Sequence, residues 1–130
     1  MKKEEIKSRR APGAIGPYSQ GIRIGRFLFL SGQIPIEPSS GEVLSTEIGA
    51  QTRQVLKNLQ GVLEEAGASM KDVVKTTVYL KNLSNFTEMN GVYGEFFTAP
   101  YPARATVEVS ALPKGVEVEI DAIAVVGDEE

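Results

Sequence analysis

The segment 101–109 alternates between apolar and polar positions with the period of a β-strand. Small and aliphatic side chains occupy one of its faces, and Arg104, Thr106 and Glu108 occupy the other. Pro100 comes just before it and stops the helical pattern upstream, because proline cannot continue a helix. The pattern therefore predicts a strand with one apolar face and one polar face.

A second alternating stretch, residues 117–126, follows after a short Leu-Pro-Lys-Gly loop. One face begins with Glu117, Glu119 and Asp121 and continues with aliphatic residues, while the other face is aliphatic throughout. This stretch is also predicted to be a strand. We therefore expect the guanidinium group of Arg104 and several carboxylates to project from neighbouring strands.

Two longer stretches repeat apolar residues with the spacing of a helix. The first covers residues 48–66, with Ser45 or Thr46 expected to cap its start and Gly67 placed just after its end. The second covers about residues 85–97 and carries its aromatic residues near one stripe. Both stretches are predicted to form amphipathic helices.

Runs of β-branched and apolar residues predict the remaining strands. Residues 22–24 and 27–32 flank a Gly-Arg pair that is typical of a hairpin, and residues 73–80 form another run. The charged start of the chain is interpreted as the solvated end of a first strand. The resulting order is strand, strand, helix, strand, helix, strand, strand. It predicts a single α+β domain over residues 1–130, with a mixed sheet and two helices on one face.

The second face of the sheet is expected to be apolar as well. The strands 27–32 and 73–80 carry apolar residues on both faces, and aliphatic residues break the polar face of the last strand. Soluble monomers seldom expose so much apolar surface, so we expect self-association through this face. A charge buried by that contact, such as Arg104 or Glu119, would then need a partner or a ligand.

Composition narrows the chemistry. The chain has a net charge of −3 and contains neither cysteine nor histidine. These counts exclude disulfides and thiol catalysis, and they remove the commonest general base and the commonest metal ligand. No basic face indicates nucleic-acid binding, and no apolar run is long enough to span a membrane. We expect a cytoplasmic protein without a metal site or a phosphate-binding loop.

Several residues admit two interpretations. Arg104 is either a strand cation paired with a nearby glutamate or a planar fork that binds a carboxylate bidentately. One of the three acidic residues of the last strand could orient or deprotonate water. Tyr18 is either a packed aromatic residue of its loop or part of a site, and Asn90 is either a residue at the solvent edge of a helix or part of a site. Gly32 either ends its strand or allows a ligand close to the backbone. Ser31 is not expected to be a covalent nucleophile, since no histidine can activate it.

Five segments, spread in order over nearly the whole chain, together resemble the Rid family of YjgF-type reactive intermediate deaminases. They are residues 14–21, 31–35, 74–80, 101–109 and 118–124. The RidA-like branch is the most similar, because both its arginine and its later glutamate are in place. The resemblance implies a chorismate-mutase-like fold and a homotrimer with three clefts between subunits.

The resemblance also implies an activity. Family members of this branch hydrolyse enamine and imine acids, such as 2-aminoacrylate, 2-iminobutanoate and 2-iminopropanoate, to 2-oxo acids and ammonia. Pyridoxal-phosphate-dependent dehydratases release these intermediates, and the deaminase itself needs no cofactor. The expected partners are therefore a small imino or oxo acid and further copies of the chain, with no nucleic acid and no membrane.

By position, Arg104 matches the arginine that holds the substrate carboxylate, and Glu119 matches the glutamate that is thought to position the attacking water. Other cleft-lining positions of the family are matched by Tyr18, Ser31, Gly32 and Asn90. Thr106, counted with the substrate-binding positions, stands where many members have cysteine. A mechanism that requires that thiol is therefore not implied here, whereas a water mechanism is.

Two other functions remain open at this stage. One is a non-enzymatic trimer whose clefts bind a small metabolite or regulate a partner protein, since a fold does not fix a function. The other is a ribonuclease, an activity also claimed for proteins that resemble this family. The acidic net charge and the lack of histidine argue against the ribonuclease.

Overall fold

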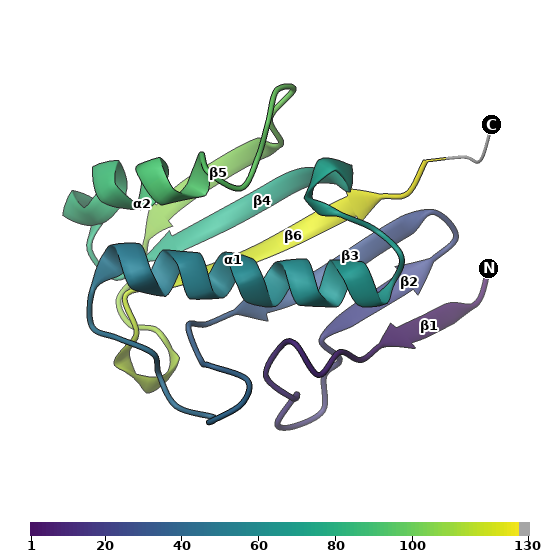
Figure 1. The fold of residues 1–130 in the computed structure, drawn as a ribbon, viewed down its shortest axis with the longest axis horizontal. Coiled ribbons are helices and arrows are strands. Elements are labelled where there is room, and N and C mark those ends of the chain that lie inside the picture. The colour runs from purple at the N-terminus through teal and green to yellow at the C-terminus, as the bar shows by residue number, and fades with distance from the viewer. Residues whose placement is uncertain (128–130) are drawn as a thin grey trace.

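The chain folds into one layer of β-sheet covered on one face by two helices (Figure 1). The structure, a computed structural model, describes residues 1–127, so the last three residues of the expected domain lie outside the described residues. The strands are β1 (Lys3–Ile6), β2 (Gly21–Ile24), β3 (Phe27–Gln33), β4 (Val73–Leu80), β5 (Ala103–Glu108) and β6 (Val118–Val125). The helices are α1 (Ile48–Glu65) and α2 (Phe86–Tyr93). The predicted α+β class and the two helices on one face are confirmed.

The six strands form one mixed sheet in the order β1-β2-β3-β6-β4-β5. The pair β4–β5 is parallel, and every other pair is antiparallel. The last strand, β6, lies between β3 and β4, so it does not neighbour β5. The expectation that Arg104 and the carboxylates of the last strand project from neighbouring strands is therefore wrong, because β4 separates them.

The core lies between the sheet and the two helices. Alternate residues of β4, namely Thr76, Val78 and Leu80, are fully buried under the helices, whereas Thr77 and Tyr79 point to the opposite face. Helix α1 contributes the largest share of fully buried aliphatic side chains: Val55, Leu56, Val62 and Leu63. Across residues 1–127, neither helix has the length and apolar character needed to cross a membrane.

Helix α1 ends where the glycine pattern predicts. Gly67 has a φ of +78°, and the backbone N–H of Ala68 donates to the carbonyl of Leu63, which is the Schellman arrangement. Its start differs from the prediction, because the residue at the N-cap is Glu47, without a side-chain cap. The Ser45 hydroxyl instead accepts a hydrogen bond from the Glu47 N–H, just before the first residue of the helix.

Two further differences concern short elements. The start of the chain forms a complete edge strand, β1, which adds a sixth strand to the predicted five. Only Ile6 of this strand is buried, so its sequence carries little apolar signal. Helix α2 stops at Tyr93 rather than near residue 97. The chain then continues through turns in which a backbone N–H donates to the carbonyl three residues earlier.

The face of the sheet away from the helices is apolar and uncovered in the single chain. Phe27, Phe29 and Val107 expose 48%, 43% and 42% of their surface there. Ile123 and Val125 of β6 lie in register with the two phenylalanines. The prediction of a second apolar face is therefore confirmed, and its extent is unusual for the surface of a soluble monomer.

Candidate functional site

Arg104 projects from β5 towards helix α2, on the helix-covered face of the sheet. It lies in register with the buried Thr76 of β4. Its guanidinium carbon lies 4.7 Å from the centre of the Tyr93 ring and 5.4 Å from the centre of the Phe86 ring. Within residues 1–127 the fork has no acidic partner. Aromatic faces thus orient the cation while its N–H donors stay available to a ligand.

Tyr93 is itself fixed by a buried hydrogen bond. Its hydroxyl lies 2.7 Å from the hydroxyl of Thr76, and both side chains are buried. Burial raises the pKa of Tyr93, while the Thr76 hydrogen bond and the nearby Arg104 charge act in the opposite direction. The phenol is therefore neutral near neutral pH and serves as a rigid support for the guanidinium group.

A cavity of about 460 Å³ opens beside the Arg104 fork. Asn90 lines this cavity from α2, and Tyr101 lines it from the segment before β5. Thr106 lies two residues along the same strand face, partly buried, and its hydroxyl oxygen is buried without a hydrogen-bond partner in the described chain. Two predicted residues, Arg104 and Asn90, therefore line one half-site, and Thr106 lies beside it on the same strand face.

Glu119 belongs to a different place, on the uncovered face of the sheet. The pairing of β3 with β6 shifts register between Leu30 and Gln33, so β3 bulges at Ser31 and Gly32. A Cβ atom added at Gly32 would lie 3.0 Å from the Glu119 carboxyl carbon, and closer still to one carboxylate oxygen. Only glycine leaves room for the carboxylate in its present position.

The neighbours of Glu119 distinguish it from the other two acidic residues of this stretch. Asp121 accepts a hydrogen bond of 3.0 Å from the Tyr79 hydroxyl, and Glu117 accepts a long one of 3.5 Å from Asn85. Glu119 has no such partner among residues 1–127. Burial, and then repulsion from Asp121, raise the pKa of Glu119. Its raised pKa and its lack of a side-chain hydrogen bond in the described chain suit a carboxylate that accepts and returns a proton.

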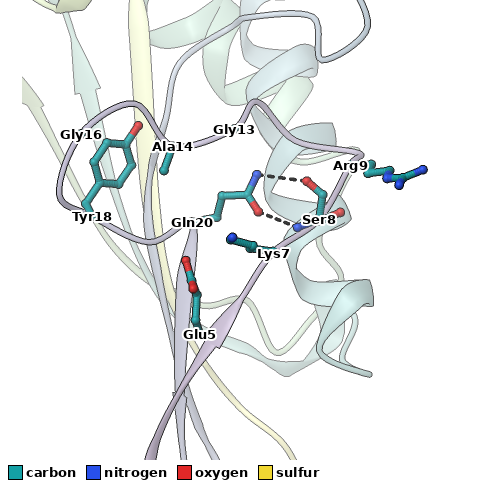
Figure 2. Close-up of a pocket in the computed structure, with 9 residues that line it drawn as sticks. All are labelled: Glu5, Lys7, Ser8, Arg9, Gly13, Ala14, Gly16, Tyr18 and Gln20. Atoms are coloured by element: carbon teal, nitrogen blue, oxygen red, sulfur yellow. Dashed lines mark hydrogen bonds between the residues drawn. The ribbon is translucent and has the colours of Figure 1, made fainter.

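Tyr18 lies on the loop 11–20, which arches over the first strands. Gln20 holds the base of this loop: its side-chain oxygen accepts from the Ser8 N–H at 2.6 Å, and its amide donates to the Ser8 carbonyl (Figure 2). The same amide also donates to the Pro12 carbonyl. Gln20 and Tyr18 both line a cavity of about 620 Å³. Tyr18 is about half exposed. Its ring lies on the other side of Gln20 from Ser8, as Figure 2 shows. The loop is anchored at its base and open at its tip.

Ser31 ties the same loop to β3. Its hydroxyl donates to the Ser19 carbonyl at 2.6 Å, and its N–H donates to the Gln20 carbonyl. The hydroxyl is thus engaged with the backbone in this structure. Ser31 therefore places the loop that carries Tyr18 close to Gly32.

A smaller cavity, of about 290 Å³, opens beside Tyr18 and Gly32. Tyr18 and Gly32 line it together with apolar residues of the segment after β3 and with Lys114. Asn58 of α1 fixes part of its wall, since its amide donates to the Ile34 and Ile36 carbonyls at 3.2 and 3.0 Å. Tyr18, Ser31, Gly32 and Glu119 therefore form a second half-site.

The two half-sites face opposite sides of one sheet. Arg104 is in register with Thr76 on the helix side, whereas Glu119 is in register with Tyr79 on the uncovered side. The expectation that the uncovered face would bury both charges is thus wrong for Arg104. The sequence interpretation also missed the roles of Tyr93 and Phe86, whose spacing indicated only a packed helix stripe.

Comparison with known proteins identifies the family of this chain. The family model described as "Endoribonuclease L-PSP" matches residues 8–126. A RutC family protein from Pyrococcus abyssi is 55% identical over 124 residues, which cover 95% of this chain and 98% of the relative. The 2-iminobutanoate/2-iminopropanoate deaminase of Escherichia coli K12 is 49% identical over 123 residues, covering 92% and 95%.

Among solved structures, Escherichia coli TdcF with bound serine superimposes with a TM-score of 0.92 at 44% identity, covering 95% of this chain and 99% of that one. The chain therefore belongs to the endoribonuclease L-PSP family, which is the Rid family indicated by its motifs. Within that family it is RidA-like, and its fold is the chorismate-mutase-like α+β fold.

Proposed function

We propose that this protein hydrolyses reactive imino acids, 2-iminobutanoate and 2-iminopropanoate, to 2-oxo acids and ammonia. The observation that carries the proposal is the Arg104 fork, held over two aromatic rings beside a cavity and without an acidic partner among residues 1–127. Such a fork suits a small carboxylate. The name of the Escherichia coli relative and the serine bound to TdcF are consistent with a ligand of this size and charge.

A site that uses both Arg104 and Glu119 requires two copies of the chain. The two side chains project from opposite faces of one sheet, so one chain does not present both to the same ligand. The exposed apolar face supplies a surface for association. We infer a homotrimer in the cytoplasm, in which Arg104 of one copy and Glu119 of the next line each cleft.

The chemistry then follows from the two half-sites. Arg104 binds the carboxylate of the imino acid and holds the electrophilic C=N carbon in place. Glu119 takes a proton from a water molecule as the water oxygen bonds to that carbon. It returns the proton to the imine nitrogen, which gives a carbinolamine. Glu119 then carries the hydroxyl proton of this adduct to the same nitrogen, so the carbonyl forms as the C–N bond breaks and ammonia leaves. No covalent enzyme intermediate is needed, because the substrate is already electrophilic.

Mixed assemblies of two inactive variants test the proposal. Arg104→Ala and Glu119→Gln are co-expressed with different affinity tags, and the mixed oligomers are purified through both tags. Oxo-acid release is measured with iminobutanoate generated by a threonine dehydratase, after subtraction of spontaneous hydrolysis. Each variant alone should have little or no activity, and every mixed trimer should regain one of its three clefts, so about a third of the sites should be restored.

The matched control mixes Arg104→Ala with the double variant Arg104→Ala/Glu119→Gln, which should restore nothing. Wild-type protein without imine hydrolysis, or an Arg104→Ala protein with the wild-type rate, would contradict the proposal. Binding of 2-oxobutanoate without turnover would favour a metabolite-binding role instead. A light-scattering mass of one chain, 14.0 kDa, would contradict the shared cleft.

A further inference from the structure

The loop before β6 places a lysine where the backbone prefers another residue. Lys114 has a φ of 57° and Gly115 a φ of 68°, and the N–H of Val116 donates to the Pro113 carbonyl at 3.3 Å. Two successive left-handed residues between these groups form a turn of type I′, which favours Asn-Gly. Lys114 is the one residue other than glycine with a positive φ among residues 1–127. Its identity is therefore not explained by the turn.

The position of Lys114 gives a reason for the lysine. Lys114 lines the 290 Å³ cavity together with Tyr18 and Gly32, and the Glu119 carboxylate lies against Gly32. The ammonium group has no ion pair or side-chain hydrogen bond in the described chain. A cation without a partner therefore borders the half-site that holds Glu119.

Two of the charges on the β6 side of this half-site are negative. Glu119 and Asp121 project from the same face of β6, and their mutual repulsion contributes to the raised pKa of Glu119. An anionic ligand that approaches them is repelled, and the net charge of −3 adds to this effect. A nearby cation offsets the repulsion at the point where the ligand enters.

We propose that Lys114 is a second anion-binding residue of the cleft, which draws in small monocarboxylates and holds them on the Glu119 side. This inference rests on the proposed function and deepens it. A carboxylate offers about four lone-pair positions, and a bidentate arginine uses two of them, so one carboxylate can accept from Arg104 and from Lys114. The binding role of the Lys114 side chain then explains why a lysine occupies this strained backbone position.

The test compares Lys114→Asn, Lys114→Gly and Lys114→Arg with wild type. The probe is 2-oxobutanoate, whose Kd is measured by calorimetry at low and at high salt. The neutral variants should bind it roughly threefold to tenfold more weakly at low salt, as expected for loss of one partly solvated charge contact. Much of this difference should vanish at high salt, because salt screens exposed charges. Lys114→Arg should bind within about twofold of wild type.

Thermal unfolding shows whether a variant is merely damaged. Glycine and asparagine suit a left-handed position, so Lys114→Gly and Lys114→Asn should melt at or above the wild-type temperature while binding more weakly. Lys71→Asn is the matched control, since Lys71 is exposed in the single turn before β4. The loop of Lys114 leads into β6 at the other end of β4, where Leu80 pairs with Val118. This control should leave the Kd unchanged.

The outcomes separate the two proposals. Unchanged Kd values in the neutral variants at low salt, or no measurable binding of 2-oxobutanoate to wild type, would overturn the role of Lys114. Imine hydrolysis by wild type would still support the proposed function in both cases. Binding that depends on Lys114 in a protein that does not hydrolyse imines would support the inference and overturn the deaminase.

Discussion

The guanidinium carbon of Arg104 lies 4.7 Å from the centre of the Tyr93 ring, and the Tyr93 hydroxyl lies 2.7 Å from that of Thr76. A mobile, fully hydrated arginine would lose much side-chain freedom on binding a ligand. Here the aromatic ring restricts the fork beforehand, and the buried hydrogen bond restricts the ring. The strand β4 thus sets the position of a side chain on its neighbour β5.

Tyr93→Leu should weaken substrate binding, and Tyr93→Phe should not. Leucine removes the ring beneath the guanidinium group, which is worth about 0.5–2 kcal/mol. We therefore expect KM for the imino acid to rise while kcat falls less. Phenylalanine keeps the ring and should retain a KM within about twofold of wild type. A KM in Tyr93→Leu equal to that of wild type would show that the ring does not position Arg104.

The same variants separate structure from positioning. Tyr93→Phe leaves the buried Thr76 hydroxyl without its partner and should destabilise the fold by about 1–2 kcal/mol, measured by denaturant unfolding. Thr76→Val combined with Tyr93→Phe removes both hydroxyls and should recover part of that loss. An additive loss in the double variant would mean that the two hydroxyls do not interact.

Gly32→Ala should impair catalysis much more than folding. A Cβ atom at residue 32 would displace the Glu119 carboxylate, whose carbon lies 3.0 Å from that point. A shift of this size in a catalytic group lowers kcat on the order of 100-fold. Gly91→Ala is the control, because nothing lies within 4 Å of its Cβ position and it sits in α2. It should stabilise the helix by about 0.5–1 kcal/mol. Equal kcat values for Gly32→Ala and wild type would show that the contact with Gly32 does not position Glu119 for catalysis.

Glu119 should give the pH–rate profile an acidic limb at a higher pH than an exposed glutamate would. Burial raises its pKa, and it must be ionised to accept a proton from water. The rate of imine hydrolysis should therefore fall as the pH drops through this raised value. Glu119→Gln should be slow at every pH and lack this limb, which steady-state kinetics across pH would measure.

Stability should change in the matching sense. The raised pKa means that the folded chain holds the Glu119 proton more tightly than the unfolded chain does. Protonated Glu119 therefore contributes fully to the free energy of unfolding below its unfolded pKa. This contribution is lost as the pH rises through its folded pKa. Glu119→Gln should therefore unfold at a higher denaturant concentration than wild type at neutral pH. The difference should shrink towards acidic pH, where wild-type Glu119 is also neutral. A difference that grows on acidification would contradict the raised pKa.

Thr106→Val should be neutral or stabilising, because it removes a buried hydroxyl that has no partner in the described chain. An unpaired buried hydroxyl costs about 1–3 kcal/mol, and valine has nearly the same shape. Thr106→Cys should keep imine hydrolysis, since the proposed water mechanism needs no thiol. A loss of stability in Thr106→Val would indicate that the hydroxyl has a partner in the assembled protein.

Local patterns in the sequence predicted most of the elements. Helical spacing identified α1, and Gly67 located its end, because both signals depend on neighbours a few residues apart. Strand alternation correctly grouped Arg104 with Thr106 on one face. The apolar second face was also predictable, since several strands lack a polar side.

The sequence did not predict which face of the sheet Arg104 occupies. Alternation shows which residues share a face, but the face that receives the helices depends on long-range pairing. The insertion of β6 between β3 and β4 is such a pairing, and it separates Arg104 from Glu119. Edge strand β1 was missed as an element because its charged residues gain little from burial.

The placement of Arg104 and Glu119 on opposite faces also has a genetic consequence. If each cleft takes one residue from each of two copies, a chain that lacks both residues impairs both clefts that it borders, although its neighbours are normal. Such an allele would lower activity by more than its share of the expressed protein. Alleles that lack only one of the two residues would partly rescue each other when both are present in one cell.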